Sequence, residues 1–319
     1  MNELDDGSRY EHIVQTVAPG SRLLRAWALG GGMSAEMSAV EMEHPDGKTE
    51  RIVVRRPGLA ALQRSPRAAR DEYLLLQFLH SLGVLVPAAV YLDESSALFP
   101  QPFLVMEYIE GKMDFQAVNL ERRLEQFAAR LAQIHQIEGF HPDLAFLPQK
   151  AVECPETNQK QPSLTEPLLQ TTRIQAILEQ AGRPARRNAL VLLHGDYWPG
   201  NVLWQGEQLA AVIDWEDAGI GDPLIDLAIS RLDLAWIFGI DAMRAFTEQY
   251  QTRAKIDATA LPYWDLCAAL RLARLAGQDL EGWTAYFHPY GRQDITRENI
   301  LENFRLFTAQ AFQQFGLIS

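Results

Sequence analysis

The sequence predicts an α+β fold of two lobes, a small lobe of five strands with one helix and a larger, mainly helical lobe. Short β-rich runs and a strong turn signal occupy the first third of the chain, whereas apolar residues recur at helical spacing after Gly111. Strands do not alternate with helices throughout, which argues against a doubly wound parallel sheet. We place the N-terminal lobe at residues 1–107 and the C-terminal lobe at residues 108–319.

The small lobe is expected to begin with strands. The second and third strands form a hairpin, because Pro45-Asp46-Gly47 between them is a strong turn signal. Leucine and aromatic residues at helical spacing predict one amphipathic helix over residues 67–82. The five expected strands cover residues 23–29, 38–43, 51–56, 90–92 and 103–108.

The large lobe is expected to be built from helices. Residues 120–137 give the clearest pattern, with Leu124, Phe127, Leu131 and Ile134 on one face. The polar, proline-containing stretch from Gln149 to Pro167 reads as a surface loop or insertion. The remaining expected helices cover residues 168–181, 223–238, 241–254, 258–276 and 295–315.

Composition excludes several classes of protein. The 319 residues carry a net charge of −12, which argues against nucleic acid as a partner because such a partner needs a basic surface. The apolar run from 224 to 240 is interrupted by Asp226, Arg231 and Asp233, so we expect no membrane span. The acidic N-terminus does not resemble a signal peptide, and Cys154 and Cys267 lack metal-site spacing. We therefore expect a soluble cytoplasmic protein.

Two acids and one amide follow apolar strands in the middle of the chain. Asp196 and Asn201 come after residues 191–193, and Asp214 comes after residues 209–213. Asp196 is suited to orient or deprotonate a hydroxyl, while Asn201 and Asp214 are suited to hold Mg²⁺ against nucleotide phosphates. This division of labour is that of a phosphotransferase.

Three ordered segments resemble the aminoglycoside phosphotransferase family. The stretch from His194 to Asn201 is similar to the family's H-x-D-x-x-x-x-N catalytic loop, and the stretch from Val212 to Trp215 resembles its metal-binding segment. Gly221-Asp222-Pro223, with Asp226-Leu227-Ala228 after it, is similar to the family's G-D-P-x-x-D-L-A signature. The resemblance extends to about Leu234, and the helices beyond give no recognisable match.

The resemblance implies a protein-kinase-like fold, ATP or GTP as phosphoryl donor, and Mg²⁺. It carries Asp196 over as the catalytic base, with Asn201 and Asp214 as metal ligands. His194 is then architectural, and Asp226 is the acid that ties down the catalytic loop.

Phosphate binding is assigned to the small lobe. Gly31, Gly32 and Ser34 lie in a glycine run whose backbone N–H groups could approach phosphates. Arg55 stands where kinases carry a phosphate-binding lysine, and is expected to pair with Glu72. The alternative is that Arg55 or Arg56 only solvates an edge strand. A similar V-L-R-R strand occurs in the phosphotransferase domains fused to acyl-CoA dehydrogenases.

The base and the acceptor are less fully specified. Residues 103–111 resemble the strand and hinge that receive adenine, with backbone groups of Glu107 and Ile109 pairing with the base. Trp198 is the best candidate for an aromatic wall of the acceptor pocket.

The favoured function is transfer of a phosphoryl group to a hydroxyl of a small molecule, either an antibiotic of the aminoglycoside or macrolide type or a metabolite. An atypical protein kinase and a catalytically weak or inactive nucleotide-binding protein are the alternatives. An acidic cleft would favour acceptors that carry amines, and its candidate residues are Glu216, Asp217, Asp233, Asp265 and Asp279. The oligomeric state stays open.

Overall fold

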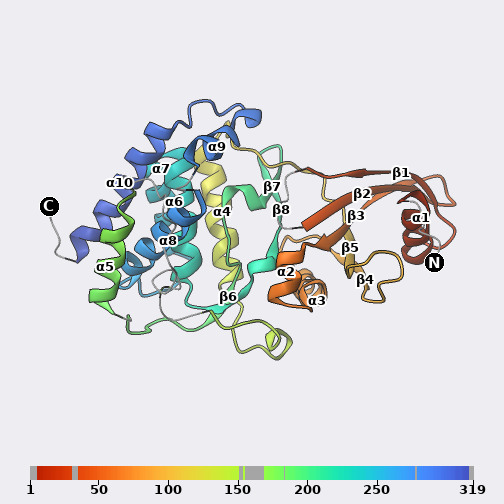
Figure 1. The fold of residues 1–319 in the computed structure, drawn as a ribbon, viewed down its shortest axis with the longest axis horizontal. Helices are drawn as coiled ribbons and strands as arrows, with labels where there is room; N and C mark the ends of the chain where they lie inside the picture. The colour runs from red at the N-terminus through yellow and green to blue at the C-terminus, as the bar shows by residue number, and fades with distance from the viewer. Residues whose placement is uncertain are drawn as a thin grey trace. The chain divides into compact units, whose positions relative to one another are not determined.

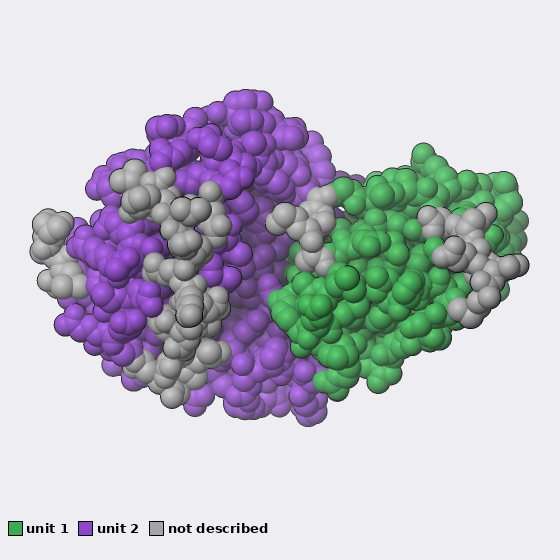
Figure 2. Space-filling view, viewed as in Figure 1, with its two compact units in different colours: residues 1–110, 211–216 green, residues 111–210, 217–319 purple. Residues whose placement is uncertain are grey.

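The computed structural model describes residues 6–30, 35–150, 154, 169–182, 184–276 and 279–315. The chain divides into two compact units, shown in different colours in Figure 2. Unit 1 comprises residues 1–110 and 211–216, and unit 2 comprises residues 111–210 and 217–319. The short return of the chain into unit 1 at residues 211–216 carries Asp214.

Unit 1 is built on a five-stranded antiparallel sheet with the order β1-β2-β3-β5-β4 (Figure 1). The predicted five strands and the predicted hairpin are confirmed, since β2 and β3 pair in register from Glu43 and Thr49 at the turn. The strands are β1 Arg22–Ala28, β2 Ala35–Glu43, β3 Thr49–Pro57, β4 Ala89–Asp93 and β5 Phe103–Glu107.

Helices cover both faces of this sheet. Helix α1, Asp6–Val17, packs with alternate residues of β2, β3 and β5 in one apolar cluster. Helix α3, Ala68–Ser81, contacts β3, β4 and β5. Because side chains alternate along a strand, Val53 and Arg55 face away from the α1 side. The predicted helix corresponds to α3, whereas α1 and the short α2, Leu59–Arg64, were not predicted.

Unit 2 is mainly helical, as predicted. Helix α6 is buried along almost its whole length and packs against α7, α8 and α10. A helix that is buried on all sides belongs at the centre of a bundle, and the polar residues of α6 are buried with the rest. Figure 1 shows these helices lying beside α4 and α5. The bounds are α4 Leu120–Ile134, α5 Thr171–Ala181, α6 Leu224–Phe238, α7 Ile240–Arg253, α8 Leu261–Ala276, α9 Leu280–Ala285 and α10 Arg297–Gln314.

Two small two-stranded sheets support the loops that carry the chemistry. Strand β6, Val191–Leu193, pairs with β9, Gly219–Gly221, and β7, Val202–Gln205, pairs with β8, Gln208–Val212. Most of the predicted insertion, residues 151–153 and 155–167, lies outside the described residues. Within the described part of the chain, no helix has the length and apolar character needed to cross a bilayer.

Candidate active site

The catalytic loop of unit 2 begins directly after β6 with a glycine that no other residue can replace without rearrangement. Gly195 has φ +84°, a region that L side chains rarely adopt. A Cβ atom built there would lie 2.0 Å from the carbonyl oxygen of Asp217. The His-Gly-Asp sequence therefore reflects a tight backbone approach as well as chemistry.

Asp226, at the start of α6, holds this loop through its backbone. Its carboxylate accepts hydrogen bonds from the N–H groups of His194 at 2.7 Å and Gly195 at 2.9 Å. Burial by itself raises the pKa of Asp226, but the hydrogen bond and charge of His135 and the bonds from the loop hold it below its usual value. The carboxylate is fully buried, so it stays ionised only because these donors surround it.

A buried polar network extends behind Asp226. The Nε2 atom of His135 lies 3.3 Å from the Asp226 carboxylate, and its Nδ1 atom lies 2.6 Å from the hydroxyl of Tyr250 on α7. The Ser230 hydroxyl donates to the carbonyl of Tyr197 at 2.6 Å. Three helices thus fix the backbone that carries the proposed base.

The Asp196 side chain is held at both oxygens. Asn201 donates from Nδ2 to Asp196 Oδ2 at 3.2 Å and to the Asp196 carbonyl at 2.9 Å. Arg271, on α8, donates from Nη2 to Asp196 Oδ1 at 2.8 Å. Arg271 was not predicted from the sequence, because α8 carries no recognisable motif and Arg271 lies 75 positions after Asp196.

Aromatic side chains gather next to the catalytic loop. The ring of Trp198 stacks on Phe115 with centroids 6.0 Å apart and lies 6.4 Å from Trp283 and 6.2 Å from Tyr286. Phe115 is buried, whereas the other three are partly exposed. The Trp198 ring also covers Gly200, where a Cβ would lie 2.1 Å from ring atoms.

Arg55 is the centre of the charged cluster in unit 1. Its guanidinium donates to Glu72 at 2.9 Å, to Asp214 at 2.8 Å and to Glu216 at 3.3 Å. The pairing expected between Arg55 and Glu72 is therefore present. Only 4% of Arg55 is exposed, and β3 lies between β2 and β5, so the alternative of an arginine solvating an edge strand is wrong.

Charge balance in this cluster depends mainly on Arg55. Burial by itself lowers the pKa of Arg55, but the charges of Glu72, Asp214 and Glu216 raise it, so the guanidinium stays protonated. Burial raises the pKa of Glu72, and Arg55 opposes that rise. Arg64 adds a weaker contact to Glu216 at 3.5 Å. The cluster therefore has more carboxylates than arginines.

Asn201 and Asp214 have the donor atoms that a hard cation requires. Since Asn201 donates from Nδ2 to Asp196, its Oδ1 atom stays available as a ligand. Arg55 occupies Oδ1 of Asp214, whose side chain is 33% exposed. Mg²⁺ is held by a few protein oxygens together with substrate phosphates, so these residues fit the ion. The described residues contain no group of three or more His, Cys, Asp or Glu that could hold a metal without such phosphates.

Asn201 and Asp214 belong to different units, Asn201 to unit 2 and Asp214 to unit 1. Their joint role as metal ligands stays a prediction. Gly31, Gly32 and Ser34 lie outside the described residues, so their proposed contact with phosphates also stays a prediction.

The proposed base-binding segment follows β5. The Glu107 N–H donates to the Ala88 carbonyl at 2.9 Å, so this donor is already used. Recognition of a base by this segment would then fall to the Glu107 carbonyl and the backbone of Ile109.

Three of the five acids considered for an amine-binding cleft, Asp265, Asp279 and Glu216, make separate local contacts. Asp265 is buried and paired with Arg231 at 3.0 Å, and Asp279 caps α9 through the Gly282 N–H. Glu216 pairs with Arg55 in unit 1. Asp233 is buried, and burial, followed by the charge of Asp196, raises its pKa to about 8.

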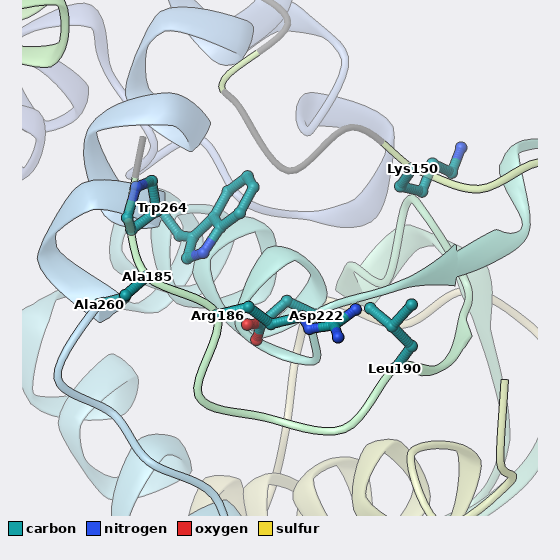
Figure 3. Close-up of a pocket in the computed structure, with 8 residues that line it drawn as sticks. Lys150, Ala185, Arg186, Leu190, Asp222, Ala260 and Trp264 are labelled. Atoms are coloured by element: carbon teal, nitrogen blue, oxygen red, sulfur yellow. The ribbon is translucent and has the colours of Figure 1, made fainter. Parts of the chain in front are cut away.

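A separate pocket of unit 2 is a small hollow that opens to solvent (Figure 3). Lys150, Arg186, Asp222 and Trp264 are among its lining residues. Asp222 already accepts hydrogen bonds from Asn188 and from the Leu224 N–H, as a turn residue does. None of the predicted site residues lines this pocket.

The antiparallel five-stranded unit, the helical unit and the two charged clusters define a protein of the kinase-like phosphotransferase class. A sequence profile described as the phosphotransferase enzyme family matches residues 28–270. The chain belongs to this family.

Individual relatives agree with this assignment. The chain is 27% identical over 221 residues to acyl-CoA dehydrogenase family member 10 of Mus musculus, a match that covers 64% of this chain and 20% of the relative. It is 27% identical over 210 residues to thiamine kinase of Escherichia coli O1:K1, covering 65% of this chain and 66% of the relative. The chain thus spans about a fifth of the first relative and about two thirds of the second.

Solved structures show the same fold. The structure of spectinomycin phosphotransferase in complex with ADP and spectinomycin superimposes with a TM-score of 0.59 and 15% identity. The match covers 96% of this chain and 97% of that protein. At this identity the likeness establishes the kinase-like fold, and the substrates named for the relative are its own.

Proposed function

We propose that this protein transfers the γ-phosphoryl group of ATP, or of GTP, to a hydroxyl of a small molecule. Asp196 is the base, and Asn201 and Asp214 would hold Mg²⁺. The observation that carries the proposal is the fixed Asp196 carboxylate, which an amide and a guanidinium hold on a loop anchored by Asp226. A carboxylate held in this way suits a reaction whose catalysis is mainly positioning and charge neutralisation.

Each side chain has a defined task in this scheme. Asp196 accepts a hydrogen bond from the acceptor hydroxyl and aligns it with the γ-phosphorus atom. As the new O–P bond forms, the bond from the γ-phosphorus to the bridging oxygen breaks, ADP or GDP leaves, and Asp196 takes the hydroxyl proton. Arg55 neutralises phosphate charge in place of the usual lysine, with Glu72 fixing its orientation. When bound, Mg²⁺ would neutralise charge on the phosphate oxygens.

The nucleotide is assigned to the N-terminal lobe, residues 1–107, and the acceptor to residues 108–319. Gly31, Gly32 and Ser34 would contact the phosphates, and Glu107 and Ile109 the base. The kinase-like fold and the buried Arg55 support this division.

Trp198, with Trp283 and Tyr286, is proposed as an aromatic wall for the acceptor. It lies two residues from Asp196, and all three rings are partly exposed. A planar or apolar body fits such a wall, since aromatic rings bury large apolar areas.

The test measures transfer from radiolabelled MgATP to thiamine, choline, spectinomycin, streptomycin and a macrolide, with mass spectrometry of each product. Asp196→Asn should abolish transfer while nucleotide binding, measured by calorimetry, stays within about threefold of wild type. Asp257→Asn is a matched control, because Asp257 is a loop acid that caps Thr259. It should keep wild-type activity.

Full activity of Asp196→Asn would disprove the assigned role. Nucleotide binding by the wild type without transfer to any acceptor would instead support the inactive nucleotide-binding protein.

A further inference from the structure

Helices α6 and α8 each carry an arginine that pairs with an aspartate, one in the helix packing and one in the catalytic loop. Arg231 of α6 binds Asp265 of α8 through two parallel bonds of 3.0 Å. Both residues are buried, so this pair joins the two helices. Arg271, further along α8, instead donates to Asp196 in the catalytic loop at 2.8 Å.

Asp233, on α6, is the second carboxylate whose charge affects Arg271, but it competes only weakly with Asp196 at neutral pH. Asp233 raises the pKa of Arg271 through its charge, but less than Asp196 does, and burial opposes both effects. The pKa of Asp233 itself is raised to about 8, mainly by burial. Asp233 is therefore mainly protonated at pH 7, and the contact that Arg271 makes is with the Asp196 carboxylate at 2.8 Å.

Arg271 and Asn201 together determine the plane of the Asp196 carboxylate. Arg271 takes Oδ1 and Asn201 takes Oδ2, and the two donors come from different parts of unit 2. Each carboxylate oxygen has two lone pairs, so one further acceptor direction stays open on each for a substrate hydroxyl.

We propose that Arg271 is a positioning residue for phosphoryl transfer, which holds the Asp196 carboxylate toward the acceptor hydroxyl. This inference rests on the proposed function, because it assumes that Asp196 is the base. The guanidinium also offsets the repulsion between a carboxylate and the phosphate that must approach it. The same charge makes Asp196 a weaker base. This lowers the rate little if the transition state is loose, because the proton then leaves the hydroxyl late in the reaction.

A lysine should not replace Arg271 fully. The planar guanidinium is rigid and presents its donors in a fixed geometry, whereas an ammonium group is a mobile point charge. Arg271→Lys should therefore keep the charge but lose part of the orientation.

The experiment compares Arg271→Met, Arg271→Lys and Arg231→Lys in the full chain. The acceptor is whichever compound of the panel gives the highest wild-type rate, and MgATP hydrolysis in its absence is measured in parallel. Arg271→Met should lower kcat by about 10²-fold, the loss expected for a reacting group misplaced by about 1 Å, while the KM for ATP stays within about threefold. Arg271→Lys should recover part of that loss.

Arg231→Lys is the matched control, because it alters an arginine–aspartate contact of the same two helices that does not touch Asp196. It should lower thermal stability with kcat within about twofold of wild type. An Arg271→Met enzyme that behaves as the control does, with lower thermal stability but kcat within about twofold of wild type, would show a structural role and overturn the inference.

Crystal structures of the variants give a readout that does not require activity. In Arg271→Met, or in Arg271→Lys if the methionine variant does not fold, Asp196 should adopt another rotamer and lose its contact with Asn201. An unchanged Asp196 rotamer in these variants would overturn the inference. A fully active Asp196→Asn enzyme would refute the proposed function. An inactive Asp196→Asn enzyme together with an Arg271→Met enzyme of wild-type kcat would refute only the role of Arg271.

Discussion

Replacing Arg55 by methionine should destabilise unit 1 more than replacing Arg56, the next residue of β3. Arg55→Met leaves Glu72, which is 7% exposed, without the charge that compensates its burial. Breaking a buried ion pair by removing one partner costs about 3–5 kcal/mol. We expect a loss of this size in the stability of β3 and α3.

Arg56→Met is the matched control on the same strand. Arg56 faces the other side of the sheet, where it lies over the Phe99 ring at 4.4 Å and pairs with Glu36, which is exposed. The pair with exposed Glu36 contributes at most about 1 kcal/mol, and the cation–π contact with the buried Phe99 ring about 1–2 kcal/mol. The adjacent substitution should therefore be less costly, because it leaves no buried charge unpaired.

Hydrogen exchange of backbone amides in β3 and α3, followed by mass spectrometry, measures this local free energy of opening. The pH dependence provides a second check. Without Arg55, the pKa of Glu72 rises further above its unfolded value, so the protonated acid stabilises the fold at low pH and that stability is lost as pH increases. The deficit of Arg55→Met should therefore be smaller near pH 5 than near pH 8. Equal exchange rates in the two variants at both pH values would refute this account.

Three further outcomes are expected in unit 2. Asp226→Asn replaces a fully buried carboxylate that accepts hydrogen bonds from two loop N–H groups. It should lower the free energy of unfolding in urea by about 1.5–3 kcal/mol per lost charged bond, and it should lower kcat. An unchanged urea midpoint would contradict the anchoring role. The pKa of Asp233 is raised to about 8, so the folded protein keeps this proton between about pH 4 and 8 while the unfolded chain releases it. Wild type should therefore lose up to about 1.4 kcal/mol of stability per pH unit in this range, and Asp233→Asn should remove that slope. A slope that persists in the variant excludes Asp233 as its source. Gly200→Ala should displace the Trp198 ring and raise the acceptor KM several-fold with an unchanged KM for ATP, whereas identical acceptor kinetics would argue against the aromatic wall.

The sequence predicted the elements that have a strong local pattern. The hairpin of β2 and β3, the helices α3 and α4 and the presence of five strands follow from turn residues and apolar periodicity. The order of the strands in the sheet was not predicted. Helix α1 was missed because its sequence is polar and acidic, and it forms by packing Ile13 and Val14 on the sheet. The short α9 was missed for a similar reason, since six residues give too little periodicity to read.

The candidate catalytic residues were predictable because their spacing within short loops is visible in the sequence. Asp196, Asn201 and Asp226 lie within about thirty positions, and hydrogen bonds between neighbouring loops fix their geometry. Arg271 carries no such signal, because its contact with Asp196 depends on how α8 packs against α6.

The sequence alone determined the class of chemistry, since a loop with an acid and an amide at fixed spacing is a local property of the chain. The tertiary structure decided how those groups are charged and oriented. It buried Arg55 among three acids, brought Arg271 to Asp196 and left Asp233 without an ion-pair partner of its own among the described residues. Such burial and long-range pairing arise only when distant segments pack together, so no local pattern of residues encodes them.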